Sequence, residues 1–496
     1  MRSFLLFFIS FLALSSFRSE AGVIQVRSQE EFDRLGGRIR SELLSGDDVH
    51  VRLDFGLYFF SERHLVLDSL ICPGSALTIS GEGAVLVGCA RPGETPSFRN
   101  GFVDLKEMRA FDAMGPVRKA GFWPLPVPFR KGVYRLRCRG ESPVSEAEAV
   151  GMKIILSQWF VGAVYEVVKI TARWIYFKRV PYRTRIWSEL RFGRCIPRYM
   201  LFSPRKADSV HPCDASNFLS LENSHLGGVV LEGIRFLGNG ERDRLIRISG
   251  VEADSVVVRE CSFEGIRSRG ILVKRTDRFR LRNSVFRSGA LNQVYVDKTT
   301  TDARIEGNRF LGNGLLMTND PVVDCKGVGF LVRNNYFQDF SYSAIGAGLH
   351  FSDTSGLVTS GVIEQNEICM SDPFRQVPMR SLIDGGAIYI WTQNKDVTIR
   401  NNYIHDIAGP HGNRGIFGDD GVVNLSICDN TVLRVRDSYA IDVRKEHGVG
   451  RRKDSAVRKA NVGIVIRGNT YDGRVRVYAR KDDPRSYIGD NNCFPR

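Results

Sequence analysis

One eight-residue pattern recurs through the second half of the chain and constrains its fold more than any other feature. The order is apolar, any, apolar, any, any, a small or amide residue, any, then aromatic or aliphatic. Nine copies follow one another, with their sixth positions at Ile234, Cys261, Ser284, Asn308, Asn335, Asn366, Asn402, Asn430 and Asn469. These positions are separated by 27, 23, 24, 27, 31, 36, 28 and 39 residues. A period in the twenties that tolerates insertions is typical of a solenoid.

The periodicity inside each copy indicates which solenoid this is. Every copy begins with alternating apolar residues, which is the period of a β-strand. No stretch of about 10–12 residues with helical spacing fits between the copies, so helical repeats are excluded. The sequence therefore predicts a coil of short parallel strands. Its six equivalent asparagines are expected to stack as a hydrogen-bonded ladder and to tolerate left-handed backbone at the bend.

The rest of the chain is expected to extend this plan. Residues 22–89 are predicted to hold the first coils, opened by a capping helix from Ser28 through Leu44 that covers the end of the solenoid. Residues 90–215 break the rhythm, contain four of the five tryptophans, and are predicted to form an inserted antiparallel β subdomain. The main parallel β-helix is expected over 216–496.

The N-terminus and the net charge indicate where the protein acts and what it binds. Residues 1–21 have one early arginine, an apolar run from Phe4 to Phe17 and small residues at 19 and 21, as in a signal peptide. We therefore expect a secreted or periplasmic bacterial protein with no membrane span, acting as a monomer. The formal net charge of +15 favours an acidic polymer, and secretion argues against nucleic acid.

The cysteines and histidines give no clear metal or disulfide pattern. Ten cysteines are scattered without a CxxC pair, so most are expected to be small buried residues. A bridge within the Cys195–Cys213 stretch stays open. His405 and His411 are interpreted as a surface pair rather than metal ligands. No metal or cofactor is predicted, except Ca²⁺ if the protein is a lyase.

Two motifs carry a family resemblance. Asp384-Gly-Gly-Ala-Ile-Tyr389 and Gly415-Ile-Phe-Gly-Asp-Asp-Gly421 resemble segments of bacterial right-handed parallel β-helix proteins of the pectate-lyase-like superfamily. Within that superfamily the chain is most similar to the β-helix glycoside hydrolases. The resemblance implies Asp384 with Asp419 or Asp420 as a catalytic pair. The chain departs from those relatives at Phe417-Gly418, where Tyr-Leu is usual, and we expect the glycine to loosen packing behind the site.

The repeat also predicts which side chains share an outer face. Val294, Ile388 and Ile416 each stand 11 residues before an apolar repeat position, so they are expected to point inward. Ile441 and Leu349 are expected to extend the series. The residues one and three positions after these inward residues should then line a groove, which gives the candidate substrate-binding residues His350, Tyr389, Trp391, Phe417 and Arg444. Lys445 is added as a substrate-binding candidate because it belongs to a basic stretch that could hold an acidic sugar. Aromatic rings beside carboxylates suit a sugar.

The same register proposes a second catalytic pair. Asp419 and Asp442 should lie one coil and two residues apart, about 8 Å between backbones. That separation falls within the window of about 6.5–9.5 Å for inverting glycosidases. Structural roles compete with each assignment. Asp384 and Asp420 precede glycines and suit turns, and Asp419 is within reach of a salt bridge to Arg444.

Together these observations predict a glycoside hydrolase that cleaves a polysaccharide or complex glycan with two Asp carboxylates. A polysaccharide lyase acting on a uronic acid polymer is the first alternative, using Arg444 or Lys445. The second is a glycan-binding or adhesive β-helix without catalysis.

Overall fold

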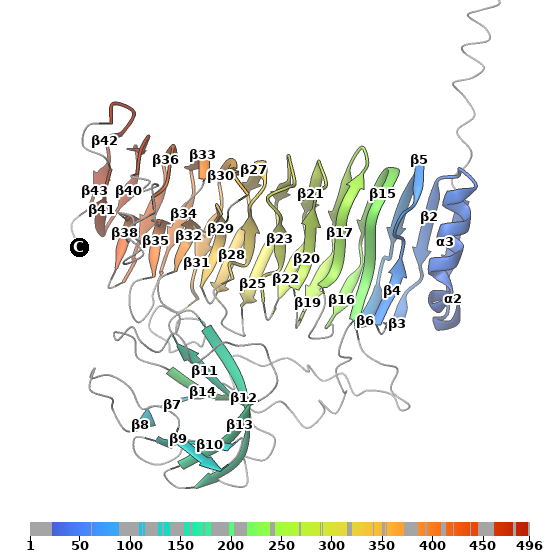
Figure 1. Cartoon of the computed structure of the whole chain (residues 1–496), viewed down its shortest axis with the longest axis horizontal. Coiled ribbons are helices and arrows are strands. Elements are labelled where there is room, and N and C mark those ends of the chain that lie inside the picture. Colours follow the sequence, from blue (N-terminus) through green and yellow to red (C-terminus); the bar gives the residue numbers. More distant parts are fainter. Residues whose placement is uncertain are drawn as a thin grey trace, which may run out of the picture.

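The computed structural model shows a rod of stacked coils with a helical cap at one end and a separate small sheet at its side (Figure 1). It describes residues 22–60, 62–88, eight strands between 109 and 202, 216–238, 244–266, 269–287, 289, 291–314, 320–340, 342–349, 353, 355–371, 385–391, 394–407, 413–419, 421–436, 438–444, 461–479 and 483–494. The predicted signal peptide, residues 1–21, lies outside these ranges. Within them no helix is long and apolar enough to cross a membrane.

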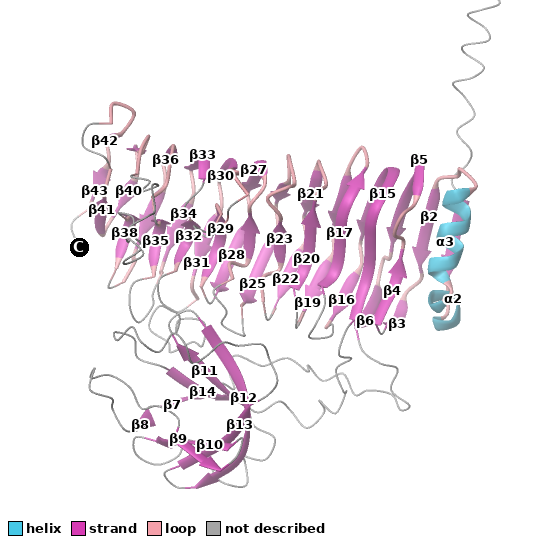
Figure 2. Ribbon diagram, in the orientation of Figure 1, coloured by secondary structure: helices cyan, strands magenta, loops and turns pink. Residues whose placement is uncertain are grey.

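Each regular coil contributes three short strands, and parallel pairing between coils joins them into three ribbons (Figure 2). The first ribbon consists of β4 (Glu62–Val66), β17 (Arg244–Glu252), β20 (Arg269–Lys274), β23 (Val294–Val296), β26 (Val323–Cys325), β29 (Ser343–Ala347), β32 (Gly386–Ile390), β35 (Arg414–Gly418), β38 (Tyr439–Val443) and β41 (Arg474–Val477). The second consists of β1 (Gly22–Val26), β2 (Val49–Leu53), β5 (Ile71–Ser80), β18 (Val256–Arg259), β21 (Phe279–Arg282), β24 (Arg304–Glu306), β27 (Val328–Arg333), β30 (Thr359–Glu364), β33 (Asn394–Arg400), β36 (Leu425–Cys428), β39 (Val465–Arg467) and β42 (Tyr487–Gly489). The long strand β15 (Ser216–Glu232) pairs with both ribbons.

The third ribbon is a separate sheet of 12 strands. It consists of β3 (Gly56–Phe60), β6 (Ala84–Gly88), β16 (Arg235–Leu237), β19 (Ser262–Glu264), β22 (Val285–Arg287), β25 (Arg309–Asn313), β28 (Tyr336–Phe340), β31 (Glu367–Cys369), β34 (Tyr403–His405), β37 (Thr431–Leu433), β40 (Thr470–Tyr471) and β43 (Asn492–Cys493). The predicted coil of parallel strands is therefore confirmed.

The interior is a single apolar column filled by the alternating residues of all three ribbons. The eighth position of the repeat supplies a stack of phenylalanines from Phe236 to Phe337, whose ring centroids are 4.4–5.1 Å apart between neighbours. Offset stacking of this kind adds to the stabilisation from burial alone. The apolar alternation read from the sequence is therefore the core of the solenoid.

The predicted asparagine ladder is present at the bend before the third ribbon. In each step the backbone N–H and side-chain amide of one asparagine donate to Oδ1 of the next, as between Asn366 and Asn402 at 3.0 and 2.9 Å. The ladder runs from Asn308 to Asn491, one coil further than the sequence analysis placed it. The left-handed residue was predicted wrongly. It precedes the asparagine, as at Asn401 (φ 55°) and Asp429 (φ 56°).

The N-terminal cap is formed by two helices rather than one. Ser28 caps α2 (Gln29–Asp33) by accepting a hydrogen bond from the Glu31 amide, as the capping box predicts, and α3 (Leu35–Leu44) follows at once. The buried residues of the helices include Phe32, Ile39 and Leu43, which join the solenoid core. The helices thus cover the apolar end of the first coil.

The insertion is an antiparallel sheet, as predicted. It contains β7 (Arg109–Phe111), β8 (Ala113–Met114), β9 (Val127–Arg130), β10 (Val133–Cys138), β11 (Lys153–Gln158), β12 (Val161–Thr171), β13 (Trp174–Arg179) and β14 (Arg198–Phe202). Each pairing within it is antiparallel. The boundaries proposed for the insertion, 90 and 215, stay predictions because they lie outside the described residues. The cap, the coils and the inserted sheet together confirm the all-β solenoid plan.

Candidate functional site

Two columns of side chains run along the outer face of the first ribbon. The mid-strand column follows the strand register and contains Tyr295, Asp324, Gly346, Tyr389, Phe417, Asp442 and Arg476. The strand-end column lies two residues further along each strand and contains Lys326, Gly348, Trp391, Asp419, Arg444 and Tyr478. Backbone hydrogen bonds align its members, as between Asp419 N–H and Ile390 O and between Arg444 N–H and Gly418 O. With about 4.8 Å per coil, the strand-end column spans about 24 Å.

The register confirms the predicted inward series at four coils, those of Val294, Ile388, Ile416 and Ile441, and corrects it at one. Ile388 pairs with Ile416, which pairs with Ile441, so Asp419 and Asp442 are one coil and two residues apart. Ile345, and not Leu349, is the inward partner of Ile388. The distance of 11 residues from an inward residue to the next repeat position does not hold at that coil, because the turn between its first and second strands is longer. Gly346 and Gly348 therefore take the outer positions of this coil, one of which was assigned to His350.

Asp442 faces outward but is fully buried and bound by three arginines. Its carboxylate accepts hydrogen bonds from Arg414 Nε at 2.8 Å, from Arg444 Nε at 3.3 Å, and from Arg476 Nε and Nη2 at 2.8 and 2.7 Å. The side chain is 0% exposed. Asp442 is therefore not the exposed groove acid that the repeat register predicts. A carboxylate enclosed by guanidinium groups holds strands together and does not reach a sugar.

Phe417 and Tyr389 are also buried on the outer face, at 0% and 4% exposure, so neither ring presents an open face to a sugar. The guanidinium of Arg414 lies 3.9 Å from the centre of the Phe417 ring, and that of Arg444 lies 5.1 Å from it. Tyr389 meets the same ring edge to face at 4.9 Å. The two rings are a packed layer between the backbone and the charged side chains. They support the site and do not form its surface.

Gly418 does not loosen this layer, contrary to the expectation from the sequence. A Cβ at this position would lie 3.2 Å from Leu425 Cδ2 and 3.4 Å from Val422 Cγ2. The space that a larger residue would fill is therefore already occupied by neighbouring side chains of the core.

Asp419 is held beside the half-exposed ring of Trp391. Its Oδ2 accepts a hydrogen bond from the Tyr389 hydroxyl at 2.8 Å, and 6% of the residue is exposed. Tyr389 meets the Trp391 ring edge to face at 5.2 Å. One tyrosine thus fixes both the carboxylate and the indole, which belong to successive members of the strand-end column.

Asp324 is an ionisable group on the same face that the sequence analysis missed. It is 2% exposed, its Oδ2 lies 3.3 Å from Lys326 Nζ, and its Oδ1 receives no hydrogen bond from the part of the chain that the structure describes. Burial raises the pKa of Asp324 to about 6, against the opposing charge of Lys326. Lys326 Nζ also lies 4.8 Å from the Trp391 ring centre and 5.3 Å from that of Tyr295.

The spacing in the sequence explains why Asp324 was missed. Val323 is the inward residue of its coil, but it precedes the repeat position Val332 by only 9 residues rather than 11. A rule built on one turn length does not find a coil with a shorter turn. The available signal was a lone acid between two apolar residues, Val323 and Cys325.

Four predicted site residues lie outside the described ranges: Asp384, Asp420, His350 and Lys445. Their roles stay predictions. Among the described residues, one group has metal-ligand chemistry, consisting of Glu367, Cys369 and His405. These residues belong to the third ribbon and not to the strand-end column.

A family model described as a right-handed beta helix region matches residues 216–404. Together with the parallel coils, this defines the chain as a right-handed parallel β-helix protein. No curated protein matches the sequence.

Solved structures that resemble the chain are distant. A glycoside hydrolase is 10% identical, with 95% of this chain and 96% of that chain covered and a TM-score of 0.44. The A-module of the Azotobacter vinelandii mannuronan C-5 epimerase AlgE4 is 12% identical, with 97% and 94% covered and a TM-score of 0.34. The Gp54 tailspike of Acinetobacter baumannii bacteriophage AP22, in complex with capsular saccharide, is 7% identical, with 96% and 74% covered and a TM-score of 0.18. At these values the activities named are properties of those proteins alone.

Proposed function

We propose that this protein acts on a glycan that lies along the strand-end column, and that it is a glycoside hydrolase. From Lys326 to Tyr478 the column presents a cation, a glycine, a ring, an acid, a cation and a ring. Its spacing of about 4.8 Å per coil is close to the length of one sugar unit. Rings stack on sugar faces, carboxylates perform acid–base chemistry, and cations bind acidic substituents. A surface about 24 Å long suits a polymer better than a monosaccharide.

The observation that carries the proposal is the Trp391–Asp419–Arg444 sequence on three successive coils. It places a half-exposed indole, an oriented carboxylate and a half-buried guanidinium next to one another. In a hydrolase, Asp419 would act as the base or nucleophile at the anomeric carbon while a second acid protonates the leaving oxygen.

Neither Asp442 nor Asp324 is a suitable second catalyst for Asp419. Asp442 is occupied by three arginines. Asp324 lies three coils and two residues away in the register, about 16 Å between backbones, and this exceeds the glycosidase window of about 6.5–9.5 Å. The sequence proposals Asp384 and Asp420 therefore stay the candidates for the proton donor.

The charges around the column favour an acidic glycan. Three guanidinium groups surround the single carboxylate of Asp442, which leaves a local positive excess, and Lys326 adds a further cation. Nearby Asp324 and Tyr295 raise the pKa of Lys326 despite burial. Lys326 is thus held protonated, which suits binding of a uronate and not proton abstraction. This charge excess is the reason to keep a polysaccharide lyase as the second candidate.

Product analysis on a panel of neutral and acidic polysaccharides tests the proposal. The wild-type protein should release reducing ends without unsaturated products, and Asp419→Asn should lower turnover by at least about 100-fold with binding retained. Trp391→Ala should weaken binding. Glu252→Gln, an exposed acid on β17, is the matched control and should leave both unchanged.

The other outcomes separate the alternatives. Unsaturated products would overturn hydrolysis in favour of the lyase. Retention of an acidic glycan without any product would leave only the binding function. Unaltered turnover in Asp419→Asn would remove Asp419 from the mechanism.

A further inference from the structure

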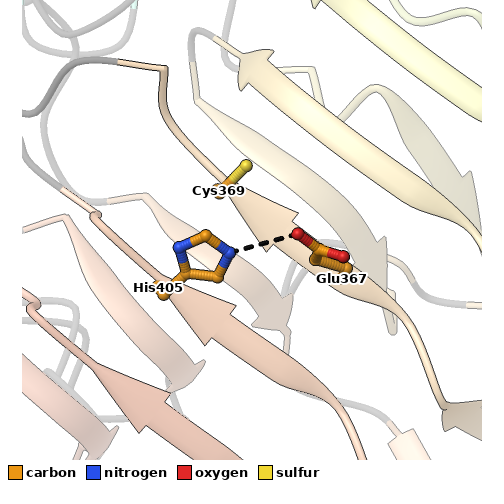
Figure 3. Close-up of side chains that lie close together, drawn as sticks. All are labelled: Glu367, Cys369 and His405. Atoms are coloured by element: carbon orange, nitrogen blue, oxygen red, sulfur yellow. Dashed lines mark hydrogen bonds and ion pairs between the residues drawn. The ribbon is translucent and has the colours of Figure 1, made fainter.

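The outer face of the third ribbon carries a cluster of three different metal-ligating side chains. Glu367 and Cys369 are two residues apart on β31, so they point to the same side of the strand, and His405 on β34 pairs directly with Cys369 (Figure 3). One ligand atom from each residue lies within 4.8 Å of the other two. The cluster has no part in the strand-end column, which lies on the first ribbon.

The distances are close to those of a tetrahedral zinc site. His405 Nε2 and Glu367 Oε1 are 3.3 Å apart. With metal–nitrogen and metal–oxygen bonds of about 2.0–2.2 Å, two ligands of a tetrahedral centre are separated by about 3.3–3.6 Å. The nitrogen and oxygen therefore already have the separation of a ligand pair. Cys369 Sγ lies within 4.8 Å of both atoms, so it needs to approach by at most about 1 Å to complete the ligand set.

Neighbouring side chains orient the histidine for this role. His405 Nδ1 lies 2.6 Å from Asp406 Oδ2, and Arg434 holds the same carboxylate through two hydrogen bonds at 2.6 and 2.7 Å. Arg434 Nη2 also lies 3.3 Å from His405 Nδ1. In the tautomer in which Nδ1–H donates to Asp406, the lone pair of Nε2 faces Glu367 and Cys369. A carboxylate behind a metal-bound histidine is the usual arrangement in zinc proteins. The Tyr403 ring stacks on the imidazole at 4.3 Å and fixes its plane.

The second observation concerns Cys369 itself. It faces the outer side of the sheet but is buried, and its sulfur has the Tyr336 hydroxyl as a hydrogen-bond partner at 3.5 Å. Glu367, in contrast, is half-exposed. The cluster thus has a protected sulfur at its base and an open side toward solvent, where a water would take the fourth position of a bound metal ion.

We propose that Glu367, Cys369 and His405 bind one divalent transition metal ion of the zinc class. A thiolate and an imidazole favour zinc over Ca²⁺ and Mg²⁺, which prefer six or more oxygen ligands. Binding releases the thiol proton and leaves the Nδ1–Asp406 hydrogen bond in place. The competing arrangement is a protonated His405 that bridges Glu367 and Asp406 as an ion pair, with no metal.

Cobalt binding to the chelator-treated full-length protein separates these two arrangements. The metal site predicts one Co²⁺ per chain with a thiolate-to-cobalt absorption band, and displacement of Co²⁺ by Zn²⁺. Cys369→Ser should remove the band, and His405→Gln should weaken affinity by at least about 10-fold. Asp406→Asn tests orientation and should weaken affinity about 10–100-fold while keeping the band.

Two cysteine variants serve as controls. Cys428→Ser on β36 and Cys493→Ser near the C-terminus should keep the band and the stoichiometry. A band that persists in Cys369→Ser would overturn the proposal, because the sulfur ligand would then be elsewhere. Absence of bound Co²⁺ in the wild-type protein would also overturn it, in favour of the ion pair. Circular dichroism of each variant shows whether the coil is intact.

Discussion

Two polar columns run along this solenoid, and they are built on opposite principles. The asparagine ladder lies at the inner bend and repeats one side chain, so that each amide bonds to the next copy of itself. The strand-end column lies on the outer face and changes residue at each coil, from lysine to tryptophan, aspartate, arginine and tyrosine. The ladder is a structural device that any coil can share. The outer column instead presents different chemical groups on successive coils, as a ligand-binding surface requires.

The largest expected effect is on the charged layer beneath the outer column. Asp442→Ala leaves three guanidinium groups without their shared carboxylate, one of them on the 3% exposed side chain of Arg414. We expect a loss of about 3–5 kcal/mol in the free energy of unfolding, measured by urea denaturation. Asp297→Ala is the control, because that carboxylate bonds to Thr299 on an exposed turn. A loss below about 1 kcal/mol would show that the layer is not structural.

The next effect concerns the middle of the ladder. Asn402→Ala removes the acceptor of the Asn366 N–H and the donor to Ile363 O, both of which are buried. Two or more unsatisfied buried groups should cost about 2–4 kcal/mol, measured in the same denaturation experiment. An unchanged midpoint would mean that the ladder is a consequence of the fold and not one of its causes.

A third effect depends on pH, because the outer face contains a buried ionisable group, Asp324, whereas the asparagine ladder has no titratable side chain. The pKa of Asp324 is about 6 in the folded protein against 3.8 as its usual value, because burial disfavours the charged form. Protonated Asp324 therefore favours the folded state relative to the ionised form. This contribution to the free energy of unfolding is fully present below about pH 3.8 and is lost as the pH rises through about 6. Asp324→Asn stays neutral, so the variant should gain roughly 2 kcal/mol relative to wild type between pH 4 and pH 7. A difference that does not change with pH would contradict the raised pKa.

The smallest effect is expected where the ladder ends. Asn491 accepts from Asn469 but is only half-buried, so water replaces much of what its side chain provides. We expect Asn491→Ala to cost about 0.5–1 kcal/mol, several-fold less than Asn402→Ala. Equal losses at the two positions would show that burial does not set the strength of the ladder.

The sequence was sufficient for everything that repeats. The ladder, the phenylalanine stack and the pairing of Ile388, Ile416 and Ile441 follow from periodicity, because identical coils need identical side chains at identical positions. The helical cap also followed from a local rule, the capping box at Ser28.

The outer face was harder to predict because burial there is not periodic. Alternation correctly placed Asp442 and Phe417 on the outside, but it carries no information on whether an outer residue is covered. The zinc-class cluster did have a signal. Cys369 and His405 each stand three residues after a ladder asparagine, so the repeat itself aligns them. The sequence interpretation paired His405 with His411, which is close in sequence. The residues that lie beside His405 are on the preceding coil.

The corner between the first and second ribbons has a consequence for how such a rod can change. In each coil, the corner separates an inward residue of the first ribbon from an inward residue of the second. This separation is 9 residues at Val323–Val332 and 25 at Ile441–Ile466, yet both coils stay in register. Segments of very different size are thus accommodated at this edge without any adjustment of the core. Exchanging these corner segments between coils would therefore change the surface along this edge while the core of the solenoid keeps its packing.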